Sequence, residues 1–483
     1  MAKELLYAKN YINGEWLDGK GELKEVVSPI DGAVIGTFRA ATPEQVDLAV
    51  RSAKAAQKEW RQVSLREKCD FLEKAAKIGF EKYAEDMARN MTLEMGKIHA
   101  ESKEEVYELG LPNLTDAVEE AKRFRTAAPP STFEKANGKK LVVKQEPLGV
   151  VASVTPWNFP IALIAEYLPY AIVLGNTNVF KPTSFCPFTG QDFIRIFDEA
   201  GLPKGVVNFV LGPGSVGTQL FRHELVDCVT FTGSTEVGLI AAKESGLKRR
   251  VLELGGNGPM IIMDDANIDA AVEASLVGIY YNAGQVCSGA ERLLAHEAVY
   301  DEFLRKFTEA SSKLVVGDPF DPKTSVGPLH DKTGLDKVIR HIDDAVSKGA
   351  KVVLGGGHKD LYFEPTVLAD VSPDAILNFE ETFGPVAPLI KFKDREEAVE
   401  IANNTIYGLS SAAFTSGLNN AWFFADNLQH GTVLINEHTN YWDYLAPFGG
   451  AKQSGNGRIL GPWILNCLSD TKLIIMDTSK SKY

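Results

Sequence analysis

The sequence has few cysteines, and they lie far apart along the chain. Cys69, Cys186, Cys228, Cys287 and Cys467 are the only five among 483 residues, with no CxxC pair and no histidine at the spacing of a zinc site. We therefore expect neither a disulfide framework nor a metal ion.

The sequence also lacks an excess of basic residues. Lysine and arginine number 51 against 64 aspartate and glutamate residues, which gives a formal net charge of −13. Binding to a phosphate backbone needs a basic field, so nucleic acid is not an expected partner. Hydrophobic residues at 45% and charged residues at 24% are typical of ordered globular proteins, and the length predicts more than one domain.

No apolar run is long enough for a clean transmembrane helix. The longest, residues 160–174, is interrupted by Glu166. The first ten residues carry charges where a secretory signal would need an apolar core. We expect no membrane segment and a cytoplasmic location.

Strand-like and helix-like segments alternate through most of the chain, after a helical stretch at 42–126. Alternation over 149–252 predicts a parallel sheet with helices on both faces, and a second alternating region at 258–440 predicts a second α/β domain. The strands are predicted at 141–143, 149–154, 177–180, 206–210, 228–231, 260–263, 292–294, 351–354, 388–390 and 431–435, and the helices at 161–174, 188–200, 215–222 and 268–283. Residues 471–476 predict a terminal strand that needs a neighbour.

Two glycine-bearing turns follow predicted strands. Gly212–Gly217 matches G-x-G-x-x-G, but the acidic residue expected at the end of the next strand is missing, so a tight structural turn is the alternative to a cofactor loop. In the next turn, Gly233 and Ser234 lie where a strand gives way to a helix. Free backbone N–H groups there suit a pyrophosphate, and an ordinary helix cap is the structural alternative.

One cysteine differs from the others in its surroundings. Cys287 lies in the glycine-bearing polar segment 282–289, whereas the other four are interpreted as small buried hydrophobes. Thirty-four residues earlier, Glu253 lies inside an apolar run followed by two glycines. Such an acid is either paired structurally or held at raised pKa as a general base.

Five sequence blocks together resemble the motifs of a known enzyme family. They are Thr155-Pro156-Trp157-Asn158-Phe159-Pro160, Leu252-Glu253-Leu254-Gly255-Gly256, Gly284-Gln285-Val286-Cys287, Glu380-Glu381-Thr382-Phe383-Gly384-Pro385, and Pro447-Phe448-Gly449-Gly450 with Lys452-Gln453-Ser454-Gly455. In this order, and over nearly the full chain, the sequence resembles the aldehyde dehydrogenase superfamily.

The resemblance implies a mechanism for oxidising an aldehyde to a carboxylic acid. Cys287 would attack the aldehyde carbon to form a thiohemiacetal, with its oxyanion held by Asn158 and by the backbone N–H of Cys287. Glu253 would activate the water that hydrolyses the resulting thioester. Asn158 capping a turn is the structural alternative. Two other functions stay open: a CoA-acylating aldehyde or semialdehyde dehydrogenase, which typically lacks this base, and a catalytically silent structural relative.

The resemblance also implies NAD or NADP as the cofactor. Lys181 matches the adenosine-ribose lysine and Glu381 the nicotinamide-ribose carboxylate. Ser184 stands where strictly NAD-dependent relatives often carry a Glu that would repel a 2′-phosphate, so we expect both cofactors to be used. The expected cofactor residues are Thr155, Pro156, Trp157, Lys181, Ser184, Gly233, Ser234, Glu381 and Phe383.

Positions that match the family's substrate tunnel are Leu163, Glu166, Val286, Ser288, Trp442 and Phe448. Semialdehyde dehydrogenases tend to place an Arg where Glu166 falls, so a substrate carboxylate would be repelled here. Glu166 with Trp442 would suit an amino or ammonium aldehyde, or the aromatic residues would pack an aromatic aldehyde. In the structural alternative, Glu166 faces solvent or pairs with an Arg. Tyr167 and Ile459 replace groups that relay protons from the base.

The implied fold is α/β, with two parallel-sheet domains and a small β arm. We expect a Rossmann-like NAD(P)-binding domain at 1–128 and 148–254, a catalytic domain at 255–453, and a bridging element for oligomerisation at 129–147 and 454–483. A homodimer or homotetramer is the expected assembly.

Overall fold

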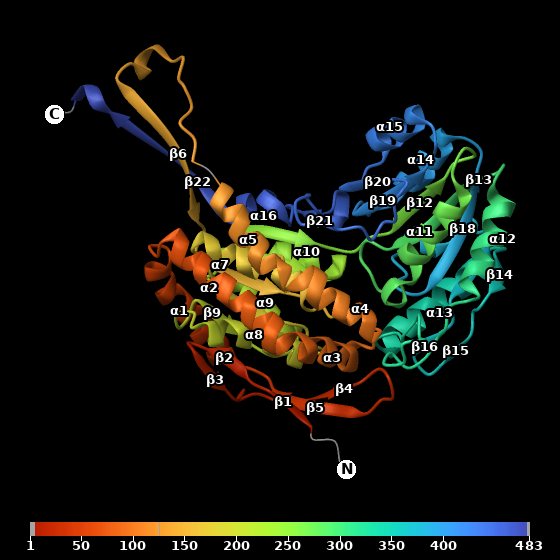
Figure 1. Ribbon diagram of the computed structural model, residues 1–483, viewed down its shortest axis with the longest axis horizontal. Helices are drawn as coiled ribbons and strands as arrows, with labels where there is room; N and C mark the ends of the chain where they lie inside the picture. Colours follow the sequence, from red (N-terminus) through yellow and green to blue (C-terminus); the bar gives the residue numbers. More distant parts are fainter. Residues whose placement is uncertain (1–4, 125, 481–483) are drawn as a thin grey trace.

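Two sheets of mostly parallel strands organise the computed structural model, which describes residues 5–124 and 126–480 (Figure 1). The first sheet has the strand order β21, β11, β10, β7, β8, β9, β2, β3. Strands β11 to β9 are parallel, and β2, β3 and β21 form antiparallel edges. Its strands are β2 (Asn10–Ile12), β3 (Glu15–Leu17), β7 (Val150–Val154), β8 (Thr177–Lys181), β9 (Val207–Phe209), β10 (Cys228–Thr232), β11 (Arg249–Glu253) and β21 (Gly455–Asn456).

Burial on both faces explains the β-branched composition of this sheet. Every residue of β7, β8 and β10 is buried, as parallel strands covered by helices require. Val150 and Ala152 pack with Val46 on one face, while Val151 packs with Leu168 on the other. The covering helices are α1 (Pro43–Trp60), α2 (Leu65–Ile78), α3 (Ala84–Met95), α5 (Pro112–Arg123), α7 (Leu168–Leu174), α8 (Pro187–Ala200), α9 (Gly214–Arg222), α10 (Thr235–Glu244) and α16 (Gly461–Cys467).

The second sheet has the order β14, β17, β18, β13, β12, β19, β20, with β14 antiparallel to its neighbour and the other pairs parallel. Its strands are β12 (Gly258–Ile262), β13 (Ala290–His296), β14 (Lys351–Leu354), β17 (Thr366–Ala369), β18 (Val386–Phe392), β19 (Ser410–Phe414) and β20 (Thr432–Ile435). The helices around it are α11 (Ile268–Tyr280), α12 (Tyr300–Ser311), α13 (Lys332–Ser347), α14 (Arg395–Asn403) and α15 (Leu418–Asn427). The predicted pair of parallel α/β sheets is thus present.

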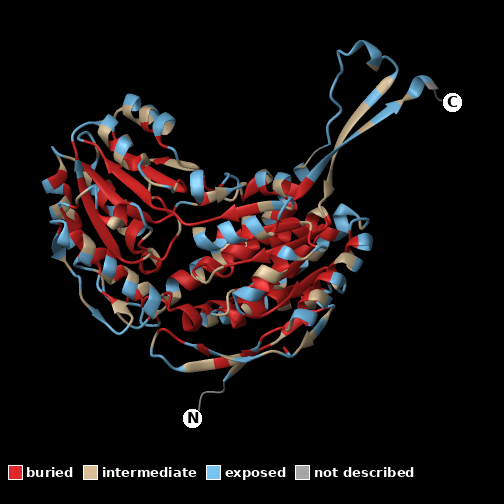
Figure 2. Cartoon of the chain, turned by 180° about the vertical axis from the view of Figure 1, so that it is seen from behind, coloured by how far each residue is buried: buried red, intermediate tan, exposed pale blue. Residues whose placement is uncertain are grey.

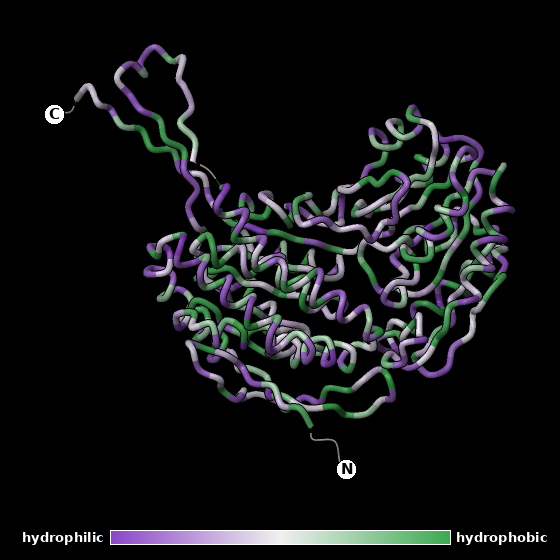
Figure 3. The backbone as a smooth tube through the Cα atoms, viewed as in Figure 1, coloured by the Kyte–Doolittle hydropathy of each residue, from purple (hydrophilic) through white to green (hydrophobic). Residues whose placement is uncertain are grey.

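Two long strands leave the body as an arm. Strands β6 (Lys139–Pro147) and β22 (Ser469–Asp477) pair antiparallel along their whole length and project away from both sheets (Figure 1). Apart from the buried Ser469 at its base, the arm is exposed or half-buried (Figure 2) although its strands carry hydrophobic residues (Figure 3). Strand β6 is therefore the neighbour that the predicted terminal strand needs. At the opposite end of the molecule, β1 (Leu6–Ala8), β5 (Val34–Arg39) and β4 (Leu23–Val27) form a small sheet.

Two predicted helices are shorter than their sequence patterns, and both breaks matter for the site. The predicted helix at 161–174 is divided into α6 (Ala162–Ala165) and α7, because Pro169 in the first turn of α7 lacks the N–H that a continuous helix would need. The predicted helix at 268–283 ends at Tyr280, and Asn282 and Ala283 adopt left-handed backbone angles. In the described part of the chain, no helix has the length and apolar character needed to cross a membrane.

Candidate active site

The order of strands in the first sheet defines where a ligand can enter. From β7 the chain goes to β8 and β9 on one side, then returns to β10 and β11 on the other. In open α/β sheets, a crevice forms at the carboxyl ends of the strands where this reversal occurs. Residues 155–158 follow β7 and residues 233–234 follow β10, so both predicted motifs flank this crevice.

The second sheet closes the crevice with loops that precede its strands. Gly255 and Gly256 lead into β12, Cys287 precedes β13, and Glu381 precedes β18. Oε1 of Glu381 accepts a hydrogen bond from the backbone N–H of Gly256 at 2.9 Å. The hydroxyl of Ser454 donates to the carbonyl of Gly255 at 2.6 Å, which explains why the block at 452–455 accompanies the others.

The nucleophile candidate and the base candidate are in direct contact. The Cys287 thiol donates a hydrogen bond to Oε1 of Glu253 at 3.1 Å. Burial raises the pKa of Glu253 to about 7, even though this hydrogen bond lowers it. Burial, together with the Glu253 charge, raises the pKa of Cys287 well above its ordinary value. The thiol therefore stays protonated near neutral pH until a base takes the proton, and ionised Glu253 is placed to do so.

Asn158 lies beside the loop that carries Cys287. Its side-chain amide donates to the carbonyl of Gln285 at 3.2 Å, and its own carbonyl accepts from the Asn282 amide at 3.3 Å. An amide nitrogen carries two hydrogens, so one donor of Asn158 stays available for an oxyanion. Gly256 packs under the same loop, where an added Cβ would lie 2.1 Å from the carbonyl of Cys287.

A cleft of about 380 Å³ opens on one side of Cys287. Eleven residues of the cleft lie in the recognised sequence blocks or in the turn after β10: Pro156, Trp157, Asn158, Gly233, Ser234, Leu254, Gly255, Gln285, Cys287, Glu381 and Phe383. Among these, Leu254, Gly255 and Gln285 have no role predicted from the sequence. Sequence reasoning missed six further lining residues: Thr232, His330, Asp331, Thr333, Gly334 and Lys337. They lie outside the recognised blocks, and no local pattern distinguishes them.

Lys181, Thr155 and Ser184 do not line this cleft but lie at or just beyond the carboxyl edge of the same sheet. The ammonium group of Lys181 is buried and, among the described residues, has no hydrogen bond or ion pair, so burial lowers its pKa to about 8. The buried hydroxyl of Thr155 also lacks a partner in the described chain. The hydroxyl of Ser184 donates to the carbonyl of Gly212 at 2.7 Å, in the G-x-G-x-x-G turn.

These residues fit a nicotinamide dinucleotide. A buried cation without a protein partner costs free energy unless a ligand supplies acceptors, which ribose hydroxyls do. Ser234 caps α10, and the N–H groups at the start of that helix face the crevice side of the sheet. At Gly255, an added Cβ would lie 3.1 Å from the Glu381 carboxylate, so the glycine keeps that carboxylate accessible.

A buried acid holds the segment that follows Glu381. The carboxylate of Glu291 accepts hydrogen bonds from the backbone N–H groups of Thr382 and Phe383 at 2.8 and 2.9 Å. Phe383 has a left-handed φ of 57° and meets Trp157 edge to face with ring centres 5.8 Å apart. Glu291 thus supports a strained turn at the end of the cleft where Trp157 and Phe383 meet, and nothing in its sequence neighbourhood predicted that role.

A second, narrow cavity of about 30 Å³ lies on the other side of Cys287. Its lining is mostly apolar or aromatic: Leu109, Phe159, Ala162, Leu163, Glu166, Glu253, Cys287, Trp442, Tyr444, Phe448 and Leu460. Four of the predicted tunnel residues are included. Val286 is buried against Phe159 and Leu163, and the Ser288 hydroxyl donates to Asn440 at 3.0 Å, so neither of these two lines the cavity.

Glu166 has an unusual environment for a carboxylate. Its Oε2 is buried without a hydrogen-bond partner in the described chain, and so is the hydroxyl of Tyr444 in the same cavity. Burial and the neighbouring Glu253 raise the pKa of Glu166 well above its ordinary value. No arginine pairs with it within the described residues, so the structural alternative of an Arg partner is not observed.

The two positions where proton-relay groups were absent have other roles. The Tyr167 hydroxyl shares a hydrogen bond of 2.8 Å with the Thr232 hydroxyl. Thr232 is paired with Glu253 on the neighbouring strand. The backbone of Ile459 exchanges two hydrogen bonds with Phe448, which lines the narrow cavity. Neither residue offers a cation or an acid to carry a proton away from Glu253.

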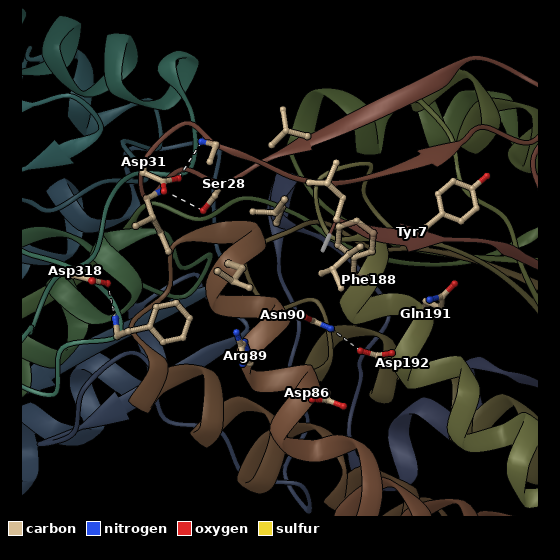
Figure 4. A pocket seen from close by; sticks show the side chains of 18 of the residues that line it. Tyr7, Ser28, Asp31, Asp86, Arg89, Asn90, Phe188, Gln191, Asp192 and Asp318 are labelled. Atoms are coloured by element: carbon tan, nitrogen blue, oxygen red, sulfur yellow. Dashed lines mark hydrogen bonds between the residues drawn. The ribbon is translucent and has the colours of Figure 1, made fainter. Parts of the chain in front are cut away.

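A larger cavity, of about 660 Å³, lies elsewhere, between the small N-terminal sheet and helices α3 and α8 (Figure 4). None of the predicted site residues lines it. Its buried acid, Asp192, is already paired with the Asn90 amide at 2.8 Å and with Arg195 at 3.0 Å. The chemistry-bearing residues therefore gather around Cys287 and not in this cavity.

Comparisons with known proteins agree with the geometry. The family model described as the aldehyde dehydrogenase family matches residues 16–474. The chain is 39% identical over 460 residues to glutarate-semialdehyde dehydrogenase of Pseudomonas putida, covering 94% of this chain and 95% of that protein. It is 40% identical over 454 residues to an NADP(+) succinate-semialdehyde dehydrogenase of Escherichia coli, covering 92% and 93%.

A solved structure is similar over almost the whole chain. Betaine aldehyde dehydrogenase from Staphylococcus aureus, in complex with NAD+, superposes with a TM-score of 0.94 at 32% sequence identity. The match covers 99% of this chain and 96% of that one.

Proposed function

The chain belongs to the aldehyde dehydrogenase family, and from this premise we propose that it oxidises aldehydes whose far end carries no carboxylate. The family match confirms the resemblance read from the sequence blocks, and with it the α/β fold and the class of enzyme. It oxidises an aldehyde with NAD or NADP.

We assign Cys287 as the nucleophile because its thiol is in contact with Glu253. Ionised Glu253, 3.1 Å from the thiol, takes its proton, and the thiolate adds to the aldehyde carbon. The carbonyl oxygen becomes an oxyanion, for which Asn158 and the backbone N–H of Cys287 are the proposed donors. The carbon then loses a hydride and becomes a thioester on Cys287.

The cofactor supplies the hydride acceptor when it is bound. We assign Lys181 to its adenosine ribose, Gly233 and Ser234 to its pyrophosphate, and Glu381 to its nicotinamide ribose. Trp157 and Phe383, which meet at the end of the cleft, would orient the ring. Thr155, Pro156 and Ser184 complete the proposed cofactor residues.

Glu253 also serves the second half of the reaction. Its Oε2 is buried and has no partner in the described chain. Once Glu253 has released the thiol proton to solvent, it is again ionised and can take a proton from water. The hydroxide formed attacks the thioester carbon, the carbon–sulfur bond breaks, and the carboxylic acid leaves while Cys287 is regenerated as the thiolate. The presence of this base argues for a hydrolytic enzyme and against the CoA-acylating and silent alternatives.

The substrate class rests on Glu166. The raised pKa of Glu166 reflects a buried carboxyl oxygen that has no donor or counter-charge in a mostly apolar cavity. An ammonium group on the substrate would supply that counter-charge and favour the ionised carboxylate, whereas a second carboxylate would supply neither a donor nor a counter-charge. The nearby Tyr444 hydroxyl, also without a partner, offers a second polar contact. We therefore place amino and ammonium aldehydes first and uncharged aromatic aldehydes second, although relatives are named for semialdehydes.

The domain division at 254/255, with 129–147 and 454–483 as a bridging element, is also proposed. The arm carries Leu473 and Ile475, each 55% exposed. Exposed apolar side chains on an extended strand pair favour a second copy of the chain as their cover, hence a homodimer or homotetramer.

A free Cys287 thiol favours the reducing cytoplasm as the location of this protein.

The test is a panel of aldehydes of matched length, followed by reduced-nicotinamide absorbance with and without CoA. We expect turnover without CoA, lost in Cys287→Ala, and a kcat/KM for 4-aminobutanal at least tenfold above that for succinate semialdehyde. A preference for the semialdehyde would overturn the substrate class, and strict CoA dependence would overturn the hydrolytic assignment.

A further inference from the structure

A helix that contains none of the sequence blocks lies along the active site. Helix α4 (His99–Glu104) continues directly into a π-helical turn, η2 (Glu105–Gly110). Such turns are rare and occur often at functional sites, because the wider turn changes which side chains share a face. Here Glu101, Glu105 and Leu109 all reach the catalytic region from this helix, and Leu109 lines the narrow cavity.

Glu105 anchors the segment that carries Asn158. Its Oε1 accepts hydrogen bonds from the backbone N–H groups of Ile161 and Ala162 at 2.9 and 3.1 Å. Its Oε2 accepts from the fully buried ammonium of Lys97 at 2.5 Å. Lys97 lies 3.7 Å from the ring centre of Phe159, the residue after Asn158. The Lys97–Glu105 pair therefore fixes the position of the segment that follows Asn158.

Glu101, one turn earlier, reaches the other half of the site. Its Oε2 accepts a hydrogen bond of 3.1 Å from the backbone N–H of Asn282. Asn282 is where the chain turns left-handed, with φ of 51°, and Ala283 follows at 54°. A left-handed backbone at Ala283 is unfavourable unless neighbouring groups stabilise it. The hydrogen bond from the Asn282 N–H to Glu101 is one such stabilising contact.

The Asn282 side chain then joins the two segments. Its amide donates to the carbonyl of Asn158 at 3.3 Å and to the carbonyl of Gln285 at 3.1 Å. Asn158 donates to that same carbonyl of Gln285, two residues before Cys287. The distance between the nucleophile and the oxyanion donor therefore depends on where Asn282 is held.

We propose that Glu101 is a positioning residue of this enzyme, which holds the left-handed turn at Asn282 so that Cys287 and Asn158 face the same carbonyl group. Glu101 touches neither substrate nor cofactor in this arrangement. This inference rests on the proposed roles of Cys287 and Asn158, and it does not depend on the substrate class assigned to Glu166.

Two reactions of the free enzyme distinguish a misplaced oxyanion donor from a less reactive Cys287. Acylation of Cys287 by p-nitrophenyl acetate, without cofactor, needs both the thiol and an oxyanion donor. Alkylation by iodoacetamide needs the Cys287 thiolate but no oxyanion donor. Wild type and Cys287→Ala define the signal and its background in both, whatever aldehyde the enzyme prefers.

The decisive pair of variants is Glu101→Leu and Glu101→Gln. Leucine removes the acceptor for the Asn282 N–H, whereas glutamine keeps a side-chain oxygen of the same reach. We expect Glu101→Leu to lose at least tenfold in ester acylation and in kcat, with iodoacetamide alkylation within threefold of wild type and an unchanged cofactor Kd. Glu101→Gln should retain ester acylation within threefold.

Asn282→Gly tests the same network without touching Glu101. Glycine keeps the left-handed turn and the N–H donor but removes the amide that joins the two segments. It should also lose ester acylation selectively, which keeps the test decisive if Glu101→Leu fails to fold. Ester acylation within twofold of wild type in the folded variants, or a parallel loss of acylation and alkylation, would overturn the proposal. If wild type acylates normally but oxidises none of the preferred aldehydes, the proposed function fails and this inference stands.

Discussion

The Cys287 thiol donates a hydrogen bond to Oε1 of Glu253 across 3.1 Å, which joins a loop of the second sheet to the last residue of a strand in the first. Burial raises the pKa of Glu253 to about 7, so the carboxylate is ionised above that pH and protonated below it. The base form is therefore lost as the pH falls through about 7.

A pH profile of kcat tests this relationship. We expect kcat of the wild type to rise with pH around a midpoint near 7, and Glu253→Gln to lower kcat by about 10² to 10⁴ while losing that rise. Glu253→Asp, which stays ionisable but is shorter, serves as the control and should keep the pH dependence at reduced rate. A Glu253→Gln profile that keeps the same midpoint would assign the titration to another group.

Substitution of Glu166 should change which aldehydes are used. Glu166→Arg replaces an acid by a cation that pairs with a substrate carboxylate, so the ratio of kcat/KM for succinate semialdehyde over butanal should rise at least tenfold, about 1.4 kcal/mol. Glu166→Gln, which cannot ionise but adds no cation, should give a smaller rise. Equal ratios in wild type and both variants would mean that Glu166 does not contact the substrate's far end.

Cofactor choice is expected to depend on Ser184. Because a serine does not repel a 2′-phosphate, kcat/KM with NADP should lie within about a thousandfold of that with NAD, roughly 4 kcal/mol in transition-state terms. Ser184→Glu should lower the NADP value by at least about 100-fold, about 2.7 kcal/mol, with little change for NAD. Ser184→Ala is the matched control, since it removes only the 2.7 Å bond to Gly212. An NADP value unaffected by Ser184→Glu would place the 2′ position elsewhere.

Lys181 should matter for cofactor binding and not for folding. Hydrogen bonds to a charged group contribute about 1.5–3 kcal/mol, so Lys181→Met should raise the KM for the cofactor by roughly 10- to 100-fold. Its buried ammonium has no partner in the described chain, so a methionine of similar length should not lower the Tm of the free enzyme. Lys313→Met, at an exposed lysine, is the control. A lower Tm with an unchanged KM would give Lys181 a structural role.

The arm is expected to hold subunits together. Ile475→Asp places a charge on the exposed apolar face of β22 and should shift the mass measured by light scattering toward the monomer at micromolar concentration. Lys140→Asp, on the paired strand β6, controls for added negative charge, because the exposed Lys140 side chain has no hydrogen bond or ion pair among the described residues. A monomeric wild type would contradict the proposed assembly.

The parts of the fold that the sequence predicted are those with a strong local pattern. Strands β7, β8 and β10 are continuous buried runs, and the structure has them within one or two residues of the predicted bounds. The predicted helix at 161–174 was wrong at its centre, because apolar periodicity continues across the break before Pro169. The roles predicted for Cys287, Glu253 and Asn158 remain predictions, although the structure brings these residues together.

The residues that support the site had no such pattern. Glu101, Glu105 and Glu291 read as ordinary charged residues of amphipathic or loop segments. Their partners are backbone N–H groups between about 56 and 181 positions away along the chain. Sequence spacing carries no information about such distances, so their burial and their contacts could only be found in the structure.

By itself the sequence determined the family, through blocks that hold a thiol, a carboxylate and an amide, and the two parallel sheets, through the alternation of β-branched and helical runs. Only the tertiary structure decided that Glu253 meets Cys287 and that Val286 and Ser288 do not line the narrow cavity. It also decided that Lys181 is buried and that Oε2 of Glu166 has no hydrogen-bond partner in the described chain. The physical reason is that the site is built where the edges of two sheets meet. Which side chains face each other there is set by the packing of remote loops, while local patterns specify only each strand and helix.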